Sequence, residues 1–334
     1  MVLRHLMPAA AAAMVALSSA SARAEDVSIM IGGIEKQIYL PAVLTERLGY
    51  FDAEGLSVTL LSEPAGVEAA DEMLAGAVQG VVGFYDHNID LQALGKYTES
   101  VVQFSQAPGE VELVSNRHPE VQSFAELTGR RLGVTGFGSS TDFLTEYLLL
   151  KAGLKFGDVT PVPVGAGDTL IAAMRHDQIQ AAMTTEPTVS RLLASNEARV
   201  LVDMRTLAGT EAALGGTYPA ACLYMETSWV NAHKETVQKL ANAFVKTMQY
   251  IATHTPEEIT AVMPSDFYVG DRAMYVQALA QGKAMFTLDG RMPSGGPETV
   301  LAVLAEIKAT VRDKPIDLSK TYTTEFVDKA NDKI

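Results

Sequence analysis

The segment that decides the fold runs Arg131-Leu132-Gly133-Val134-Thr135-Gly136-Phe137-Gly138-Ser139-Ser140-Thr141-Asp142. Residues 131–135 form a short apolar run of the kind that is buried in a sheet. The next residues are glycines, which permit a tight turn, and then Ser, Thr and Asp, which are favoured at the start of a helix. The segment therefore predicts a junction between a strand and a helix. Free N–H groups at such a helix start can hold an anion without a basic side chain.

Capping of the helix explains the same residues without any ligand, and the segment by itself does not separate the two interpretations. It lacks the Lys of a phosphate-binding P-loop, and no third glycine completes a dinucleotide-binding fingerprint. The segment therefore disfavours nucleotide binding.

Outward from this segment, short apolar runs alternate with helix-period segments from Val27 to about Met225. This alternation predicts two α/β layers, each a parallel sheet covered by helices on both faces. From His233 onward the chain reads as helices, with turn residues between them. The breaker-rich segments 105–109 and 215–219 bracket the second α/β run. They are interpreted as surface loops or as the two crossings of a hinge.

The first 24 residues have the pattern of a secretory signal peptide. Arg4 and His5 precede an apolar run from Leu6 to Leu17, and the triplet Ala22-Arg23-Ala24 forms a cleavage site. Cleavage there predicts a mature chain that begins at Glu25 and is exported to the periplasm. The apolar run is shorter than the ~20 residues that a membrane-spanning helix needs.

Composition excludes several classes of protein. The 334 residues carry 40 acidic and 26 basic side chains, a net charge of −14. This balance argues against a nucleic-acid or anionic membrane partner, since both need clustered Lys and Arg. The single cysteine, Cys222, cannot form an internal disulfide, and no Cys/His spacing typical of a zinc site occurs. No nucleophile elbow, metalloprotease or kinase motif occurs either, so no catalytic residue, cofactor or metal is expected.

Polar residues follow three further strand-like runs, at the strand ends where open α/β sheets bind ligands. These junctions are 32–37, 85–88 and 184–187. Asp86 and His87 in the second junction could serve as an acid/base pair or as metal ligands. No third ligand or nucleophile stands at a recognisable spacing, so hydrogen bonding to a ligand or capping of the next helix is the favoured interpretation.

Three stretches resemble one protein family. Leu48-Gly49-Tyr50-Phe51-Asp52-Ala53-Glu54-Gly55-Leu56 is similar to the GYF-x-x-E-G-L segment of ABC-transporter substrate-binding proteins. The stretches 127–140 and 172–187 match the same group, which includes the nitrate, sulfonate, taurine and thiamine-precursor (NMT1/THI5-like) proteins. The resemblance implies a type II periplasmic binding protein, with two α/β lobes joined by a two-crossing hinge. The implied organisation is 25–107 and 219–334 for the first lobe and 108–218 for an inserted second lobe.

The resemblance also implies a pocket between the lobes and a role in delivering a small, anionic organic solute, such as a sulfonate or carboxylate, to the permease of an ABC importer. The chain is expected to act as a monomer. The segment 138–141 is expected to hold the anionic group, and Asp86 or Glu186 to meet an amine or ring N–H of the solute. The expected ligand-binding residues are Gly33, Gln37, Tyr85, Asp86, His87, Gly138, Ser139, Ser140, Thr141, Thr185, Glu186 and Tyr218.

Two alternatives come from other functional classes. One is an enzyme on the same fold, such as a pyrimidine-precursor synthase; those enzymes carry a cysteine-rich run, whereas this chain has Cys222 alone, and they lack an export signal. The other is a ligand-binding subunit that docks on a sensor.

Overall fold

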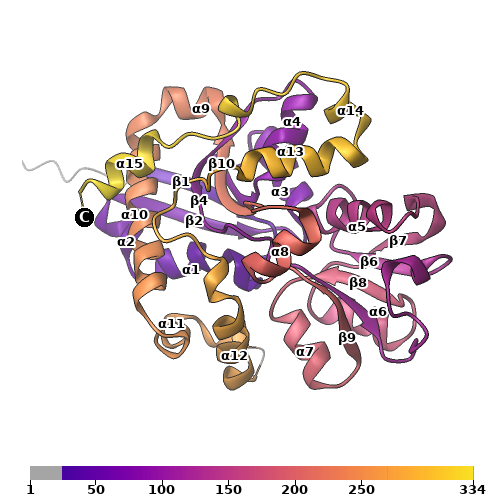
Figure 1. Cartoon of the computed structure of the whole chain (residues 1–334). Coiled ribbons are helices and arrows are strands. Elements are labelled where there is room, and N and C mark those ends of the chain that lie inside the picture. The colour runs from indigo at the N-terminus through magenta and orange to yellow at the C-terminus, as the bar shows by residue number, and fades with distance from the viewer. Residues whose placement is uncertain (1–24, 269, 334) are drawn as a thin grey trace, which may run out of the picture.

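A computed structural model describes residues 25–268 and 270–333, and the expected signal peptide lies outside them. Two five-stranded sheets organise this part of the chain (Figure 1). We call each sheet with its covering helices a lobe: the first lobe contains the sheet β2-β1-β3-β10-β4, and the second contains β7-β6-β8-β5-β9. Within the described ranges, no helix is both long and apolar enough to cross a bilayer.

The sheet of the first lobe is mixed. Its strands are β1 (Glu25–Ile31), β2 (Leu56–Ser62), β3 (Gly80–Phe84), β4 (Thr98–Gln103) and β10 (Ala221–Glu226). β1 is parallel to β2 and β3, but β10 lies between β3 and β4 and is antiparallel to both. The expectation of an all-parallel sheet was therefore wrong. β4 ends, and β10 begins, at the edge that faces the second lobe, so the returning strand must run in the opposite direction.

The second sheet is also mixed, because the strand that enters this lobe runs antiparallel to its neighbours. Its strands are β5 (Val111–Ser115), β6 (Arg131–Val134), β7 (Thr160–Pro163), β8 (Ala181–Thr184) and β9 (Ala198–Asp203). β5, the first strand to enter this lobe, is antiparallel to β8 and β9, while β6 is parallel to β7 and β8. A separate apolar core, which includes Leu113, Leu170 and Ile179, packs between this sheet and its helices.

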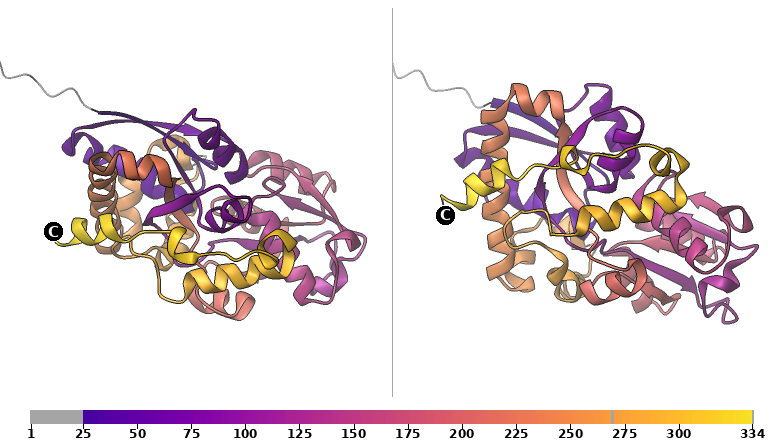
Figure 2. Two further views of the ribbon diagram at one scale, coloured as in Figure 1. Left: turned by 90° about the horizontal axis from the view of Figure 1, so that it is seen from above. Right: turned by 45° about the horizontal axis from the view of Figure 1, so that its top comes forward.

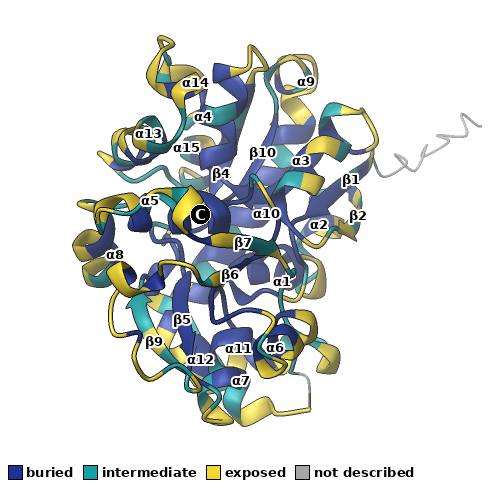
Figure 3. Cartoon of the chain, turned by 90° about the vertical axis from the view of Figure 1, so that its right-hand side faces the viewer, coloured by how far each residue is buried: buried dark blue, intermediate teal, exposed yellow. Residues whose placement is uncertain are grey.

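Helices cover both sheets, as the alternating sequence pattern predicts. Those within the strand-rich part are α1 (Leu40–Arg47), α2 (Tyr50–Ala53), α3 (Gly66–Leu74), α4 (Asp86–Ala93), α5 (Ser140–Lys151), α6 (Asp168–Arg175), α7 (Thr188–Ala194) and α8 (Leu207–Leu214). The C-terminal helices are α9 (Thr227–Ala232), α10 (Lys234–Thr253), α11 (Pro256–Val262), α12 (Arg272–Gly282), α13 (Gly296–Ile307), α14 (Ala309–Arg312) and α15 (Glu325–Asn331). Figure 3 shows the strands largely buried and the outer surfaces of many helices exposed.

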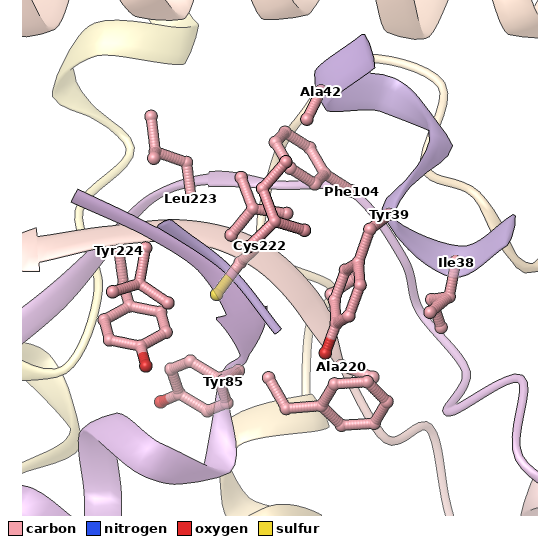
Figure 4. Packing of buried hydrophobic residues seen from close by; sticks show 14 of the residues in the cluster. Ile38, Tyr39, Ala42, Tyr85, Phe104, Ala220, Cys222, Leu223 and Tyr224 are labelled. Atoms are coloured by element: carbon pink, nitrogen blue, oxygen red, sulfur yellow. The ribbon is translucent and has the colours of Figure 1, made fainter. Parts of the chain in front are cut away.

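The long helix α10 joins the C-terminal region to the first lobe. Its Phe244 ring meets Phe51 of α2 edge-on, with centroids 5.3 Å apart, and lies 4.9 Å from the ring of Phe104. Tyr39, Tyr85 and Tyr224 surround the buried Cys222 in the same core (Figure 4). These contacts explain why Phe51 of the Gly49-Tyr50-Phe51 motif is buried. Its ring packs against α10 and so anchors the C-terminal helices to the first lobe.

Two chain segments that connect the lobes lie side by side. The N–H of Gly109 donates to the carbonyl of Met204 over 3.1 Å, and the N–H of Met204 donates to the carbonyl of Glu110 over 2.9 Å. Gly109 has a φ of +64°, which favours glycine, and a Cβ there would come 2.8 Å from the sulfur of Met285. The chain therefore passes between the lobes through a narrow paired connection, the geometry of a hinge.

A second contact between the lobes is made by the C-terminal region. α13 packs against α5 of the second lobe, and both views of Figure 2 show them adjacent. The ammonium group of Lys308, which follows α13, lies 4.0 Å from the ring centroid of Phe143 in α5. The lobes are thus in contact along the cleft that separates their sheets.

Candidate functional site

A small cavity lies between the two lobes, at the strand ends where the sequence places its polar junctions. It measures about 10 Å³, which is room for about one water molecule. Its walls are formed by Lys36, Tyr39, Gly66, Phe84, Glu110, Thr135, Ser139, Ser140, Thr141 and Thr185. The lobes therefore meet almost completely around a polar centre.

The N-terminus of α5 forms one wall, as the strand-to-helix segment predicts. The hydroxyls of Thr135, Ser139 and Thr141 form a closed network, with oxygen–oxygen distances of 2.8–3.0 Å. Ser140 differs, because its hydroxyl donates to Oε1 of Glu110 over 2.6 Å. An internal carboxyl group thus occupies the position at the helix start where an anionic solute was expected.

Glu110 is a buried acid in the cavity wall, and its surroundings strongly change its pKa. It is 1% exposed, and burial raises its pKa to about 8, while the hydrogen bond from Ser140 opposes the rise. The negative charge of Asp86 raises this pKa further, and the positive charge of Lys36 lowers it. Glu110 therefore retains its proton far more readily than an exposed glutamate.

Lys36 supplies a buried cation to the opposite wall. Its ammonium group donates to the carbonyls of Gly32 at 2.6 Å and Pro64 at 3.1 Å, and burial lowers its pKa. Two of its three N–H donors are thus used by the backbone. Gly33 makes room for this side chain, since a Cβ there would come 2.5 Å from Cε of Lys36.

Asp86, His87 and Tyr218 lie behind the cavity wall of the first lobe. The Tyr218 hydroxyl donates to Oδ2 of Asp86 over 3.2 Å, and burial raises the pKa of Asp86. Oδ1 of Asp86 and Nε2 of His87 are buried and have no hydrogen-bond partner among the described residues. Asp86 and His87 therefore offer polar atoms close to the cleft.

The other predicted residues are engaged elsewhere. Gln37 donates its N–H to the carbonyl of Glu186 over 3.0 Å and its side-chain amide to the carbonyl of Tyr275 over 2.9 Å. The Tyr85 hydroxyl is hydrogen-bonded to Thr321. Gly138 donates its N–H to Asp142, over 2.8 Å.

Glu186 has a structural partner that the sequence analysis did not anticipate. Its carboxylate lies 2.7 Å from the Arg205 guanidinium and also accepts the N–H of Ser190 over 2.9 Å. Arg205 in turn donates to the side-chain oxygen of Gln281, from α12 of the first lobe, over 3.0 Å. Glu186 thus belongs to a buried ion pair at the junction of the lobes.

Of the predicted residues, the structure brings Ser139, Ser140, Thr141 and Thr185 to the cavity wall. Sequence reasoning missed Lys36, Tyr39 and Glu110. Glu110 carries a signal that could have been used: Glu110 and Glu112 alternate with apolar residues in a strand, which places both acids on one face of a buried sheet. Lys36 gives no such signal, because its burial depends on carbonyls of the folded chain. No cluster of three metal-binding side chains occurs in the parts of the chain that the structure describes.

Comparison with known proteins agrees with this architecture. A protein of Bordetella bronchiseptica RB50 is 35% identical, with a TM-score of 0.89 over 92% of this chain and 97% of that chain. The alkanesulfonate-binding protein SsuA from Xanthomonas axonopodis pv. citri bound to MOPS is 17% identical, with a TM-score of 0.73 over 91% of this chain and 100% of that one. The periplasmic nitrate-binding protein NrtA from Synechocystis PCC 6803 is 13% identical, with a TM-score of 0.73 over 92% and 89%.

The latter two similarities show the fold, which is that of periplasmic binding proteins, as predicted. No curated protein matches the sequence. The family model described as NMT1/THI5 like matches residues 38–259. The chain therefore belongs to the NMT1/THI5-like family.

Proposed function

We propose that this protein is a periplasmic solute-binding protein that encloses a small organic solute between its lobes and delivers it to the permease of an ABC importer. The observation that carries the proposal is the cavity between the lobes, lined by buried polar side chains from both of them. Ligand sites in two-lobed α/β proteins occupy this position, and closure of the lobes excludes water from the bound solute.

The expected anionic group of the solute has two candidate partners. One is the first turn of α5, where backbone N–H groups and the helix dipole favour negative charge. The other is Lys36, which has one N–H donor beyond those that bind Gly32 and Pro64. Both lie on the cavity wall, from opposite lobes.

Binding is better supported than catalysis. Cys222 is fully buried, and burial raises the pKa of its thiol, whereas a nucleophilic cysteine needs a lowered pKa and access to substrate. The Asp86 carboxyl accepts a hydrogen bond from Tyr218, and the hydroxyls of Thr135, Ser139 and Thr141 on the cavity wall are hydrogen-bonded to one another. The alternative of a sensor subunit is distinguished by the neighbouring genes, because adjacent permease and ATPase genes support import.

The experiment that tests the proposal combines a thermal-shift screen with solution scattering. The screen covers sulfonates, nitrate, small aromatic acids and pyrimidines, because a ligand at 100 times its dissociation constant stabilises the folded state by ~2.7 kcal/mol. Because the cavity of about 10 Å³ is too small to hold a solute, the lobes must separate for a solute to enter, and the bound form must enclose it in a wider cavity than this one. We expect a stabilising solute to lower the radius of gyration relative to the open, solute-free form in solution; an unchanged radius at saturation would contradict the closure.

A further inference from the structure

The balance of polar atoms around the cavity favours solutes that bring hydrogen-bond donors. Oε2 of Glu110, Oδ1 of Asp86 and the Thr185 hydroxyl are buried and have no hydrogen-bond partner within residues 25–268 and 270–333. The carboxyl groups can accept hydrogen bonds and the hydroxyl can accept or donate one. The ammonium group of Lys36 already donates two of its three N–H groups to the carbonyls of Gly32 and Pro64. Once the two carboxyl groups are ionised, the unpartnered side-chain atoms beside the cavity are therefore mainly acceptors.

Glu110 is the carboxyl group placed to use a donor from the solute. Its side chain lines the cavity directly, and the hydrogen bond from Ser140 holds Oε1 in one position. Oε2 is left for a second partner. Removing a carboxyl group from water is costly unless hydrogen bonds or opposite charges compensate it. With a pKa of about 8, Glu110 keeps its proton near neutral pH in the empty site. A cation beside Oε2 favours the ionised carboxylate and offsets the repulsion from Asp86, so that Oε2 accepts a hydrogen bond from the solute.

We propose that Glu110 determines specificity by accepting a hydrogen bond from an ammonium, amidine or exocyclic amino group of the solute. The inference rests on the proposed solute-binding function and names the class of solute: amine-bearing molecules bind in preference to molecules of the same shape that lack the donor. Lys36 and the start of α5, on the same cavity walls, remain for the acceptor or anionic end of such a molecule.

The test uses three pairs of probes in which one member lacks the donor: taurine and propane-1-sulfonate, β-alanine and butyrate, cytosine and uracil. Each is titrated calorimetrically into the wild-type protein and into Glu110→Gln. The Gln side chain keeps the size of Glu and an oxygen that can accept from Ser140, but it loses the carboxylate. Glu112→Gln is the matched control, because Glu112 is also a buried glutamate of the same strand region but does not line the cavity.

We expect at least one amine-bearing probe to bind at least about tenfold more tightly than its partner, since hydrogen bonds to charged groups are stronger than those between neutral groups. Glu110→Gln should remove most of this preference, and Glu112→Gln should retain it, with both variants folded by thermal melting. Equal affinity within every pair that binds, or a preference that survives Glu110→Gln, would overturn the inference and leave the solute-binding function standing. If none of the six probes nor any member of the screen binds, both are contradicted.

Discussion

Gly66 lies directly against His87: a Cβ at Gly66 would come 2.8 Å from Nε2 of the imidazole. Gly66 begins α3 and lines the cavity, while His87 lies in the first turn of α4. The two helices therefore meet at the cleft through a glycine whose missing side chain leaves space for the ring.

Substitution of this glycine should displace the imidazole. Gly66→Ala is expected to weaken solute binding, because overpacking a buried site costs about 1–3 kcal/mol. Gly157→Ala is the control, since a Cβ at Gly157 meets nothing within 4 Å. Calorimetry with a solute found in the screen measures the difference. Equal affinities in the two variants would show that His87 can move without affecting the cavity.

The raised pKa of Glu110 predicts how stability depends on pH. The folded-state pKa of about 8 exceeds the ordinary value of 4.5, so between these values the folded protein binds more protons than the unfolded chain. Stability should therefore fall as pH rises from about 4.5 to about 8, by up to about 1.4 kcal/mol per pH unit for this group. Tyr39 lines the same cavity, and Lys36 and Asp86 act on Glu110 through their charges. Burial also raises the pKa of Asp86, so Asp86 should add to the loss of stability as pH rises.

Urea unfolding of the wild type and Glu110→Gln at pH 5, 6.5 and 8 tests this dependence. The variant should lose less stability than the wild type between pH 5 and pH 8, because the Gln side chain does not titrate. Parallel curves for the two proteins would mean that Glu110 titrates normally in the folded state.

The buried ion pair of Arg205 predicts a large loss of stability. The Arg205 and Glu186 side chains are 10% and 5% exposed, and removing one partner of a buried pair costs about 3–5 kcal/mol. Arg205→Leu should therefore destabilise the protein by this amount. Arg175→Leu breaks the pair with Glu197, in which the Arg is 58% exposed, and should cost at most about 1 kcal/mol. Similar urea midpoints for the two variants would refute the distinction.

A disulfide across the cleft should hold the lobes together. A Cβ at Gly136 in the second lobe would lie 3.0 Å from Cβ of Ala65 in the first, about 0.5 Å below the ~3.5–4.5 Å found in disulfides, so a small separation of the lobes would accommodate the bond. Oxidised Ala65→Cys/Gly136→Cys should neither take up nor release a solute, and reduction should restore exchange. The single variant Ala65→Cys is the control. Free exchange in the oxidised double variant, with the bond shown by mass spectrometry, would argue against opening at this edge.

The N-terminal 24 residues, which lie outside the described residues, should be removed on export. The Ala22-Arg23-Ala24 triplet predicts that export from a Gram-negative host leaves a chain beginning at Glu25. The mass of the periplasmic protein measures this directly, with a preparation made in the cytosol for comparison. Recovery of intact Met1 in the periplasmic fraction would contradict it.

Local sequence pattern determined the class of fold and the family. Strands buried on both faces need apolar side chains throughout, so β3 reads as an uninterrupted run whose five residues are all buried. The helix start at Ser139–Ser140 and the glycine stops could be predicted for the same reason: these residues act on backbone groups within a few positions of themselves. The NMT1/THI5-like identity followed from such segments, and the family comparison confirmed it.

Tertiary structure alone decided the direction of β10 and the composition of the cavity. β10 pairs with strands more than one hundred residues earlier, so its direction depends on where the chain returns from the second lobe. Glu186 is held by Arg205, and Lys36 is held by the carbonyls of Gly32 and Pro64. Glu110 keeps one oxygen beside the cavity that has no hydrogen-bond partner among residues 25–268 and 270–333. Residue type reveals a charge, but the availability of that charge to a solute depends on which distant groups already compensate it, and only the folded chain brings those groups together.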